Sequence, residues 1–85
     1  ISILDAQPRT LGYDKTIVFY NDSEQFHYEK PDDLADLRSG TVCSPNNFAY
    51  SEPLGEGVMR ISVLANYDRW AALDCDAYRL AKLRW

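Results

Sequence analysis

Short apolar stretches alternate with turn residues along the whole chain, a pattern typical of a small β-rich domain. Strands are predicted at residues 1–4, 15–20, 25–29, 41–44 and 58–65. Because the turn at 21–24 separates the second and third stretches, we expect these two to form a β-hairpin. The last stretch is the most continuously apolar and is expected near the centre of the sheet.

One short helix is expected near 31–38. Pro31 suits the first helical position, and Asp32 and Asp33 complement the positive end of the helix dipole. Arg38 and the glycine that follows shortly after it suit the end of a helix.

Two interpretations compete for the C-terminal segment. In one, alternating apolar residues form two further strands. In the other, a helix near 69–83 begins with Asp68 as its N-cap, but Leu83 and Trp85 fall off its apolar stripe, which favours strands. We therefore expect a mainly β fold, a small antiparallel β-sandwich or barrel with one short helix near 31–38. The alternative is an α+β fold with the C-terminal helix.

The two cysteines, Cys43 and Cys75, predict a disulfide, because short chains with an even number of cysteines are commonly stapled. Closing a loop of about 32 residues would stabilise the fold by roughly 3 to 4 kcal/mol in the chain-entropy model. Because the chain starts at Ile1 rather than methionine, we expect a single processed, disulfide-stapled domain, residues 1–85, secreted or periplasmic after signal removal. The alternative is a cytoplasmic protein with two free thiols.

Charge is distributed unevenly along the chain. The net charge of -4 argues against nucleic acid as a partner, because phosphate binding relies on Lys and Arg. Residues 1–57 hold four basic and ten acidic residues, whereas residues 58–85 hold five basic and three acidic ones. The C-terminal third is thus a candidate basic face on an acidic body, unless the two parts pair within the chain. No apolar run approaches the roughly 20 residues of a membrane span.

Aromatic residues are numerous: six tyrosines, three phenylalanines and two tryptophans exceed what a core of this size requires. Tyr, Trp and Arg are the residue types that most often anchor protein interfaces. We therefore expect another protein as the partner. The predicted binding residues are Tyr67, Arg69, Trp70, Arg79 and Arg84. The alternative role for Trp70 and Trp85 is closure of the core.

Catalytic and metal-binding patterns are sparse, so no enzymatic activity, cofactor or metal site is predicted. The single histidine, His27, excludes a two-histidine acid–base pair, and the carboxylate clusters do not follow an EF-hand loop. A small hydrolase that cleaves phosphodiesters is the enzymatic alternative. It would use His27, Glu24, Glu29 and Arg60.

A calcium- or carbohydrate-binding domain is a further alternative. The predicted order of hairpin, helical turn and strands resembles a βγ-crystallin Greek key, with Tyr20 and Phe26 at its aromatic corner and residues 46–51 at its calcium-binding stretch. The sequence departs from that pattern, because the aromatic spacing is one residue longer, no glycine follows Phe26, and Tyr50 replaces Ser or Thr. The family is therefore not assigned.

We expect a small secreted, non-catalytic module that binds another protein as an inhibitor or effector. An intracellular acidic interaction protein of the immunity or antidefence type is the alternative, and its acidic surface would cover a basic target. The expected oligomeric state is a monomer, or a dimer paired through an exposed edge strand.

Overall fold

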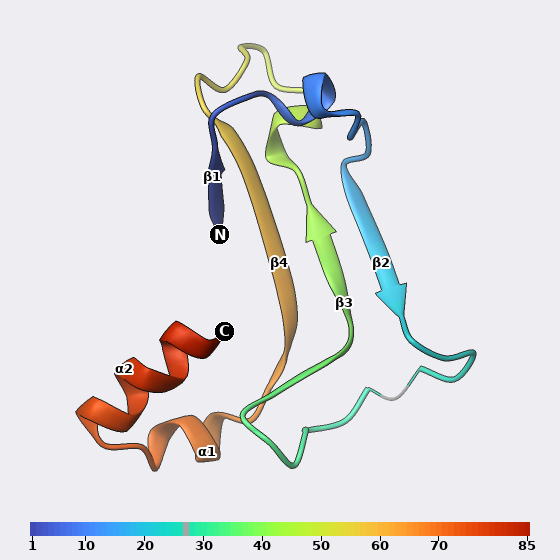
Figure 1. Ribbon diagram of the computed structural model, residues 1–85. Helices are drawn as coiled ribbons and strands as arrows, with labels where there is room; N and C mark the ends of the chain where they lie inside the picture. The colour runs from blue at the N-terminus through green and yellow to red at the C-terminus, as the bar shows by residue number, and fades with distance from the viewer. Residues whose placement is uncertain (27) are drawn as a thin grey trace.

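The computed structural model describes residues 1–26 and 28–85, and its centre is one four-stranded antiparallel sheet (Figure 1). The strands are β1 (Ser2–Leu4), β2 (Ile17–Asn21), β3 (Ala35–Cys43) and β4 (Gly57–Ala65), in the spatial order β1-β4-β3-β2. The predicted edge position of residues 1–4 and inner position of residues 58–65 are confirmed. Two 3-10 helices, η1 (Pro8–Leu11) and η2 (Pro45–Asn47), lie in the loops at one end of the sheet.

The sheet is open and forms a single layer, so the expected sandwich or barrel is wrong. Two helices, α1 (Tyr67–Ala71) and α2 (Cys75–Arg84), follow β4 and leave the sheet at the end opposite to η1 and η2 (Figure 1). The alternative of an α+β chain with a C-terminal helix is confirmed in outline, as two helices rather than one. Within the described residues, neither helix has the length and apolar character needed to cross a membrane.

Two side-chain caps explain why the C-terminal segment is helical. Asn66 Oδ1 accepts a hydrogen bond from the backbone N–H of Arg69 at 3.2 Å, and Asp74 Oδ1 accepts one from that of Ala77 at 2.8 Å. Each cap satisfies a backbone donor that has no partner within the first helical turn. The first cap is therefore Asn66 rather than the predicted Asp68, and the strand interpretation did not take the second cap into account.

The predicted helix near 31–38 is wrong, because residues 35–43 form β3, which has a neighbouring strand on each side. Pairing with two strands stabilises this backbone through hydrogen bonds on both sides. A helix of about two turns is only marginally stable by itself. The ladder is irregular between Asp36 and Gly40, and there Arg38 donates to both carboxylate oxygens of Asp36 at 2.9 and 2.6 Å. These hydrogen bonds lower the pKa of Asp36 to about 2.

The two stretches predicted as a hairpin do not pair with each other, because β2 pairs with β3 instead. The Asn21 Nδ2 and Ser23 Oγ atoms donate to the carbonyl of Gln25 at 3.0 and 2.7 Å, and these bonds turn the chain away from the path of a tight hairpin. Within the predicted strand 25–29, none of the described residues belongs to a strand. His27, which belongs to that stretch, lies outside the described residues.

Amide side chains hold the loops around η1 and η2 together. Asn47 is buried, and its Nδ2 donates to the carbonyls of Tyr13 at 3.0 Å and Lys15 at 2.8 Å. Asn46 Nδ2 donates to Gln7 Oε1 at 2.8 Å. We call Gln7, Asn46 and Asn47 the amide clamp. The stretch compared above with a calcium-binding sequence thus begins with two structural amides.

Both cysteines are free thiols in the structure, so the predicted disulfide is not formed. Cys43 is 4% exposed at the end of β3, near η2, whereas Cys75 is exposed at the start of α2. Figure 1 shows the end of β3 and the start of α2 toward opposite ends of the molecule, and a disulfide requires Cα atoms within about 7 Å. Arg60 Nη2 lies 3.9 Å from the Cys43 sulfur instead. Export of the chain stays a prediction.

The single-layer architecture leaves a large surface. The chain exposes 6901 Å², whereas a compact monomer of 9.8 kDa exposes about 5,200 Å². Its radius of gyration is 15.7 Å, against about 12 Å for a compact domain of this length. Domains ordinarily bury a sheet under a second layer, so the excess of about 1,700 Å² represents packing surface that has no partner within the chain.

Candidate functional site

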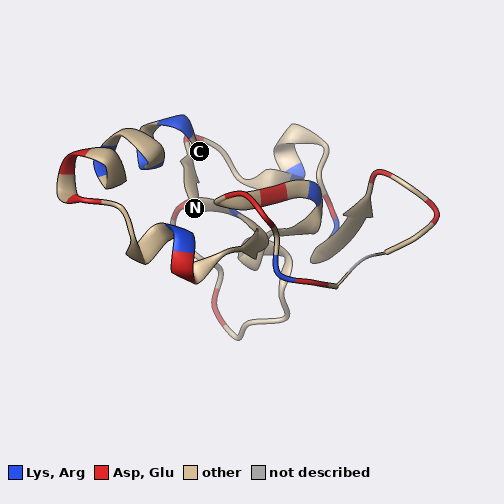
Figure 2. Cartoon of the chain, turned by 90° about the horizontal axis from the view of Figure 1, so that it is seen from below, with Lys and Arg blue, Asp and Glu red and all other residues tan. Residues whose placement is uncertain are grey.

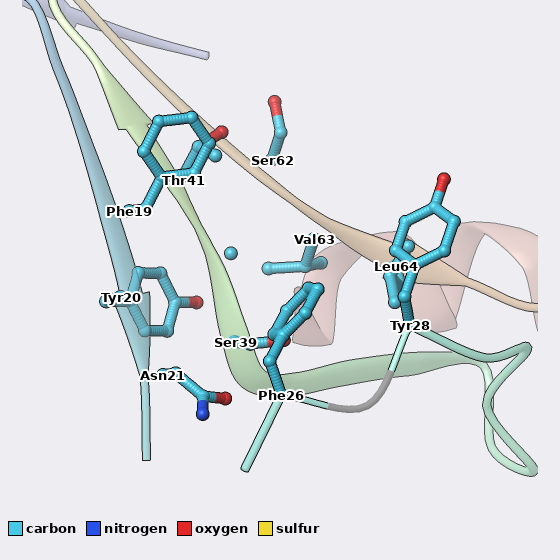
Figure 3. A pocket seen from close by; sticks show the side chains of 11 residues that line it. Phe19, Tyr20, Asn21, Phe26, Tyr28, Ser39, Thr41, Ser62, Val63 and Leu64 are labelled. Carbon is cyan, nitrogen blue, oxygen red and sulfur yellow. The ribbon is translucent and has the colours of Figure 1, made fainter. Parts of the chain in front are cut away.

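A hollow of about 550 Å³ lies against β2, β3 and β4, beside the loop that follows β2 (Figure 3). Figure 3 shows Phe19 and Tyr20 on the β2 side of this hollow and Phe26 and Tyr28 on the loop side. The wall is mostly apolar. The lining residues are Phe19, Tyr20, Asn21, Phe26, Tyr28, Ser39, Gly40, Thr41, Ser62, Val63 and Leu64.

The sheet register and one glycine shape the floor of the hollow. Gly40 lies between Tyr20 on β2 and Val63 on β4. A Cβ atom at Gly40 would lie 2.5 Å from the carbonyl oxygen of Ser62, 2.9 Å from Val63 Cγ1 and 3.0 Å from the Tyr20 hydroxyl. Any side chain at this position would displace its neighbours, so glycine is required for the three strands to approach as they do.

Three of the four aromatic side chains of the hollow are exposed rather than packed, and the fourth, Tyr20, is half-buried. Phe19 is 79%, Phe26 61% and Tyr28 80% exposed, and the rings of Phe26 and Tyr28 lie 6.3 Å apart. An aromatic residue that serves the core buries most of its surface, whereas contiguous exposed apolar surface marks interaction sites. The hollow therefore has the character of a binding surface.

The loop that borders the hollow is acidic. Residues 22–33 hold five carboxylates against one lysine: Asp22, Glu24, Glu29, Asp32 and Asp33 against Lys30. Figure 2 shows these carboxylate positions along the loop. Lys30 Nζ is itself paired with Asp68 Oδ2 of α1 at 2.7 Å. Asp36 holds the pKa of Arg38 above its ordinary value, and the nearby charges of Asp22 and Glu29 raise it further. The border therefore favours a cationic ligand.

The binding residues predicted on α1 have different environments. Trp70 is half-buried, its Nε1–H donates to the carbonyl of Leu34 at 2.8 Å, and its ring meets that of Tyr78 edge to face at 5.7 Å. These contacts give Trp70 a structural role, because they attach α1 to the segment before β3. Tyr67 and Arg69 are exposed, and their role in binding stays a prediction.

Arg79 and Arg84 are exposed on α2, where they flank two exposed leucines. Leu80 is 69% and Leu83 85% exposed. At 3.6 residues per turn, the order around the helix is Arg79, Leu83, Leu80, Arg84, within an arc of about 140°. In the described part of the chain, neither arginine has a carboxylate within ion-pair distance. We call Leu80 and Leu83 the leucine seam. Asp76 lies on the same side of α2, one turn before Leu80. Because its carboxylate is charged, the apolar seam is confined to the last turns of the helix.

The residues of the hydrolase alternative are not brought together. Arg60 pairs with Cys43 in the sheet, whereas Glu24 and Glu29 lie in the loop after β2. That loop begins four residues along β2 from the row of Arg60, or roughly 13 Å. His27 lies outside the described residues. Among the residues that are described, no group of three or more His, Cys, Asp and Glu side chains could hold a metal ion.

Sequence reasoning identified only part of this site. The excess of aromatic residues led us to predict a protein-binding surface, but the predicted binding residues lie between 67 and 84 and not at the hollow. Phe19 and Leu64 join Phe26 and Tyr28 only because β2 pairs with β3 and β3 with β4. That long-range register has no local signal, so the hollow was not predicted.

Comparisons with protein-family models, with curated proteins and with solved structures found no match to this chain. Function is therefore inferred from the chemistry of the site. Its main features are the hollow, the acidic border and the leucine seam.

Proposed function

We propose that the chain is a non-catalytic protein-binding module, which accepts an apolar segment of a partner in the hollow. The cluster of exposed Phe19, Phe26 and Tyr28 side chains carries this proposal. Protein interfaces are centred on aromatic anchors and surrounded by a polar rim, and the hollow and its acidic border have this arrangement.

The acidic border favours a basic amphipathic segment as the ligand. A helix docks into an apolar groove through side chains spaced three or four residues apart, which leaves its flanks free to carry charge. Carboxylates along residues 22–33 would steer cationic flanks toward the hollow and disfavour acidic competitors.

Such binding accounts for an inhibitor or effector role, because covering a partner's surface requires no turnover. The intracellular alternative, in which an acidic surface covers a basic target, uses the same hollow. The proposal therefore holds for an exported or an intracellular chain.

The proposal is tested by photo-crosslinking in the source cells, with p-benzoylphenylalanine in place of Phe19 or of Leu11. The two side chains are 79% and 62% exposed, so both probes are accessible. We expect position 19 to give one adduct of defined mass, which disappears when Phe26→Ser is added, and position 11 to give none. Equal labelling from both positions, or none from position 19, would contradict the proposal.

A further inference from the structure

We infer that the leucine seam of a second copy fills the hollow, so that two chains form a symmetric dimer by exchanging α2. The inference rests on the proposed function, because it names the partner of the same site. Three observations support it: the loose attachment of α2, the matching charges, and the amount of surface left exposed.

α2 is attached to its own chain mainly through α1. Tyr78 contacts Trp70, and Lys82 Nζ lies 5.5 Å from the Tyr78 ring centre, so these contacts remain within the two helices. In the described part of the chain, α2 has no extensive contact with any strand. α1, in contrast, is anchored, because Asn66 Nδ2 donates to the carbonyl of Pro31 at 2.7 Å.

α2 and the loop that borders the hollow lie apart in the same chain. Figure 2 shows α2 on one side of the sheet end and the acidic loop on the other. The connection between the two helices is the short segment 72–74, and α1 is held in place. A second copy can bring a seam to the hollow without breaking these anchors.

Charge complementarity favours the same chain as the partner. In the described part of the chain no carboxylate lies within ion-pair distance of Arg79 or Arg84, which flank the seam, while the loop at 22–33 borders the hollow with an excess of carboxylates. A two-fold axis pairs each patch with its counterpart twice, because a symmetric interface uses the same surface on both chains. The acidic and basic parts of the sequence would thus be paired between copies.

The exposed area agrees with a stable dimer. Obligate homodimers bury about 2,000 to 5,000 Å² in total, or about 1,000 to 2,500 Å² per chain. The excess of about 1,700 Å² over a compact monomer lies within that range. A second copy that covers the hollow and part of the open sheet would therefore bring the exposed area to an ordinary value.

The test is sedimentation equilibrium of the purified chain and of two variants, Leu83→Asp and Leu11→Asp. Both leucines are exposed, 85% and 62%, so the same charge is introduced without disturbing a core. We expect a wild-type dimer, a Kd about 100-fold higher for Leu83→Asp, and a change below about threefold for Leu11→Asp. Raising the salt concentration should also weaken the dimer.

A wild-type chain that is monomeric at about 100 µM would overturn the inference, since an obligate dimer associates well below that concentration. A dimer that is insensitive to Leu83→Asp would overturn it as well, and would favour pairing through an edge strand.

The photo-probe at position 19 separates this failure from that of the proposed function. An adduct of twice the chain mass supports the exchange of α2. An adduct with a different protein, formed by a monomeric chain, overturns the second copy as partner and leaves the protein-binding function standing. The absence of any adduct overturns both.

Discussion

At the end of the sheet near η1 and η2, polar side chains form hydrogen bonds with the backbone of the loops. In contrast, α2 and the loop after β2 present their side chains to solvent. Asn46 shows the first case, because its Oδ1 accepts from the backbone N–H of Val58 at 2.7 Å and its Nδ2 donates to the carbonyl of Glu56 at 2.6 Å. Leu83, 85% exposed, shows the second. The side-chain amides at the first end are used in folding, while apolar and charged groups at the second end are available for binding.

This difference predicts that stability and association can be changed separately. Removing a buried amide side chain leaves the carbonyl groups that it bonded without a donor, which lowers the free energy of unfolding. Exposed side chains of α2 contribute little to the fold of one chain, because surface substitutions usually change stability by less than about 0.5 kcal/mol. Substitutions at the amide clamp should therefore lower the stability of the fold, and those on α2 should weaken the association of two chains.

The largest effect on stability is expected from Gly57→Ala at the clamped end. A Cβ at Gly57 would lie 2.0 Å from the backbone oxygen of Ala6, which has no alternative rotamer. We expect a loss of about 3 kcal/mol in the free energy of unfolding, measured by urea denaturation. Gly55→Ala is the control, because nothing lies within 4 Å of its Cβ. Equal urea midpoints for the two variants would show that this close approach does not exist.

A smaller loss is expected from Asn47→Ala, which removes two hydrogen bonds of the amide clamp. The carbonyls of Tyr13 and Lys15 would lose their donor in a part-buried site, at a cost of about 2 kcal/mol. The control is Asn21→Ala, whose side chain is exposed and whose loss should change stability by less than about 0.5 kcal/mol. Similar losses in both variants would remove the distinction between the two ends.

Asp74→Ala should weaken the association of two chains more than it lowers the stability of the sheet. Removal of this N-cap costs a helix about 1 kcal/mol, so α2 frays and the seam loses its order. We expect lower ellipticity at 222 nm and a severalfold higher dimer Kd, with little change in the unfolding of the sheet. Asp74→Asn is the control, because asparagine caps a helix about as well as aspartate does. The account fails here if both variants dimerise as the wild type does.

The smallest effect is expected from Asp36, whose pKa falls from 3.8 to about 2 because Arg38 donates hydrogen bonds to its carboxylate. A carboxyl group with a lowered pKa in the folded state stabilises the fold at pH values above its unfolded pKa. That contribution is lost as the pH falls from about 4 through about 2. Asp36→Asn should reduce the pH dependence of the urea midpoint in this interval. Identical profiles for wild type and variant would contradict it.

Local patterns were sufficient where one strand or turn carries its own signal. The continuous apolar character of residues 58–65 predicted β4 and its inner position in the sheet. They failed in the first part of β3, because Arg38 and Gly40 suit the end of a helix, whereas the strand predicted at 41–44 overlaps the last residues of β3. Pairing with strands distant in sequence outweighs those preferences.

The C-terminal segment shows the same limit at the site. Leu83 was counted against a helix because it falls off the buried stripe, yet on α2 it is an exposed residue of the leucine seam. Arg79 and Arg84 were predicted as binding residues. They lie beside the seam, and their role in binding stays a prediction. The hollow itself depends on the register of three strands, which no short stretch of sequence encodes.

Hydrogen–deuterium exchange at about 1 and 100 µM chain tests the contrast between the two ends most directly, because mass action changes only the population of the dimer. We predict that protection of α2 and of the loop after β2 rises together with concentration. Protection of the loops held by the amide clamp should stay constant. Concentration-independent exchange in both α2 and that loop would contradict the account, because it would show that the exposed end of the molecule has no second copy as its partner.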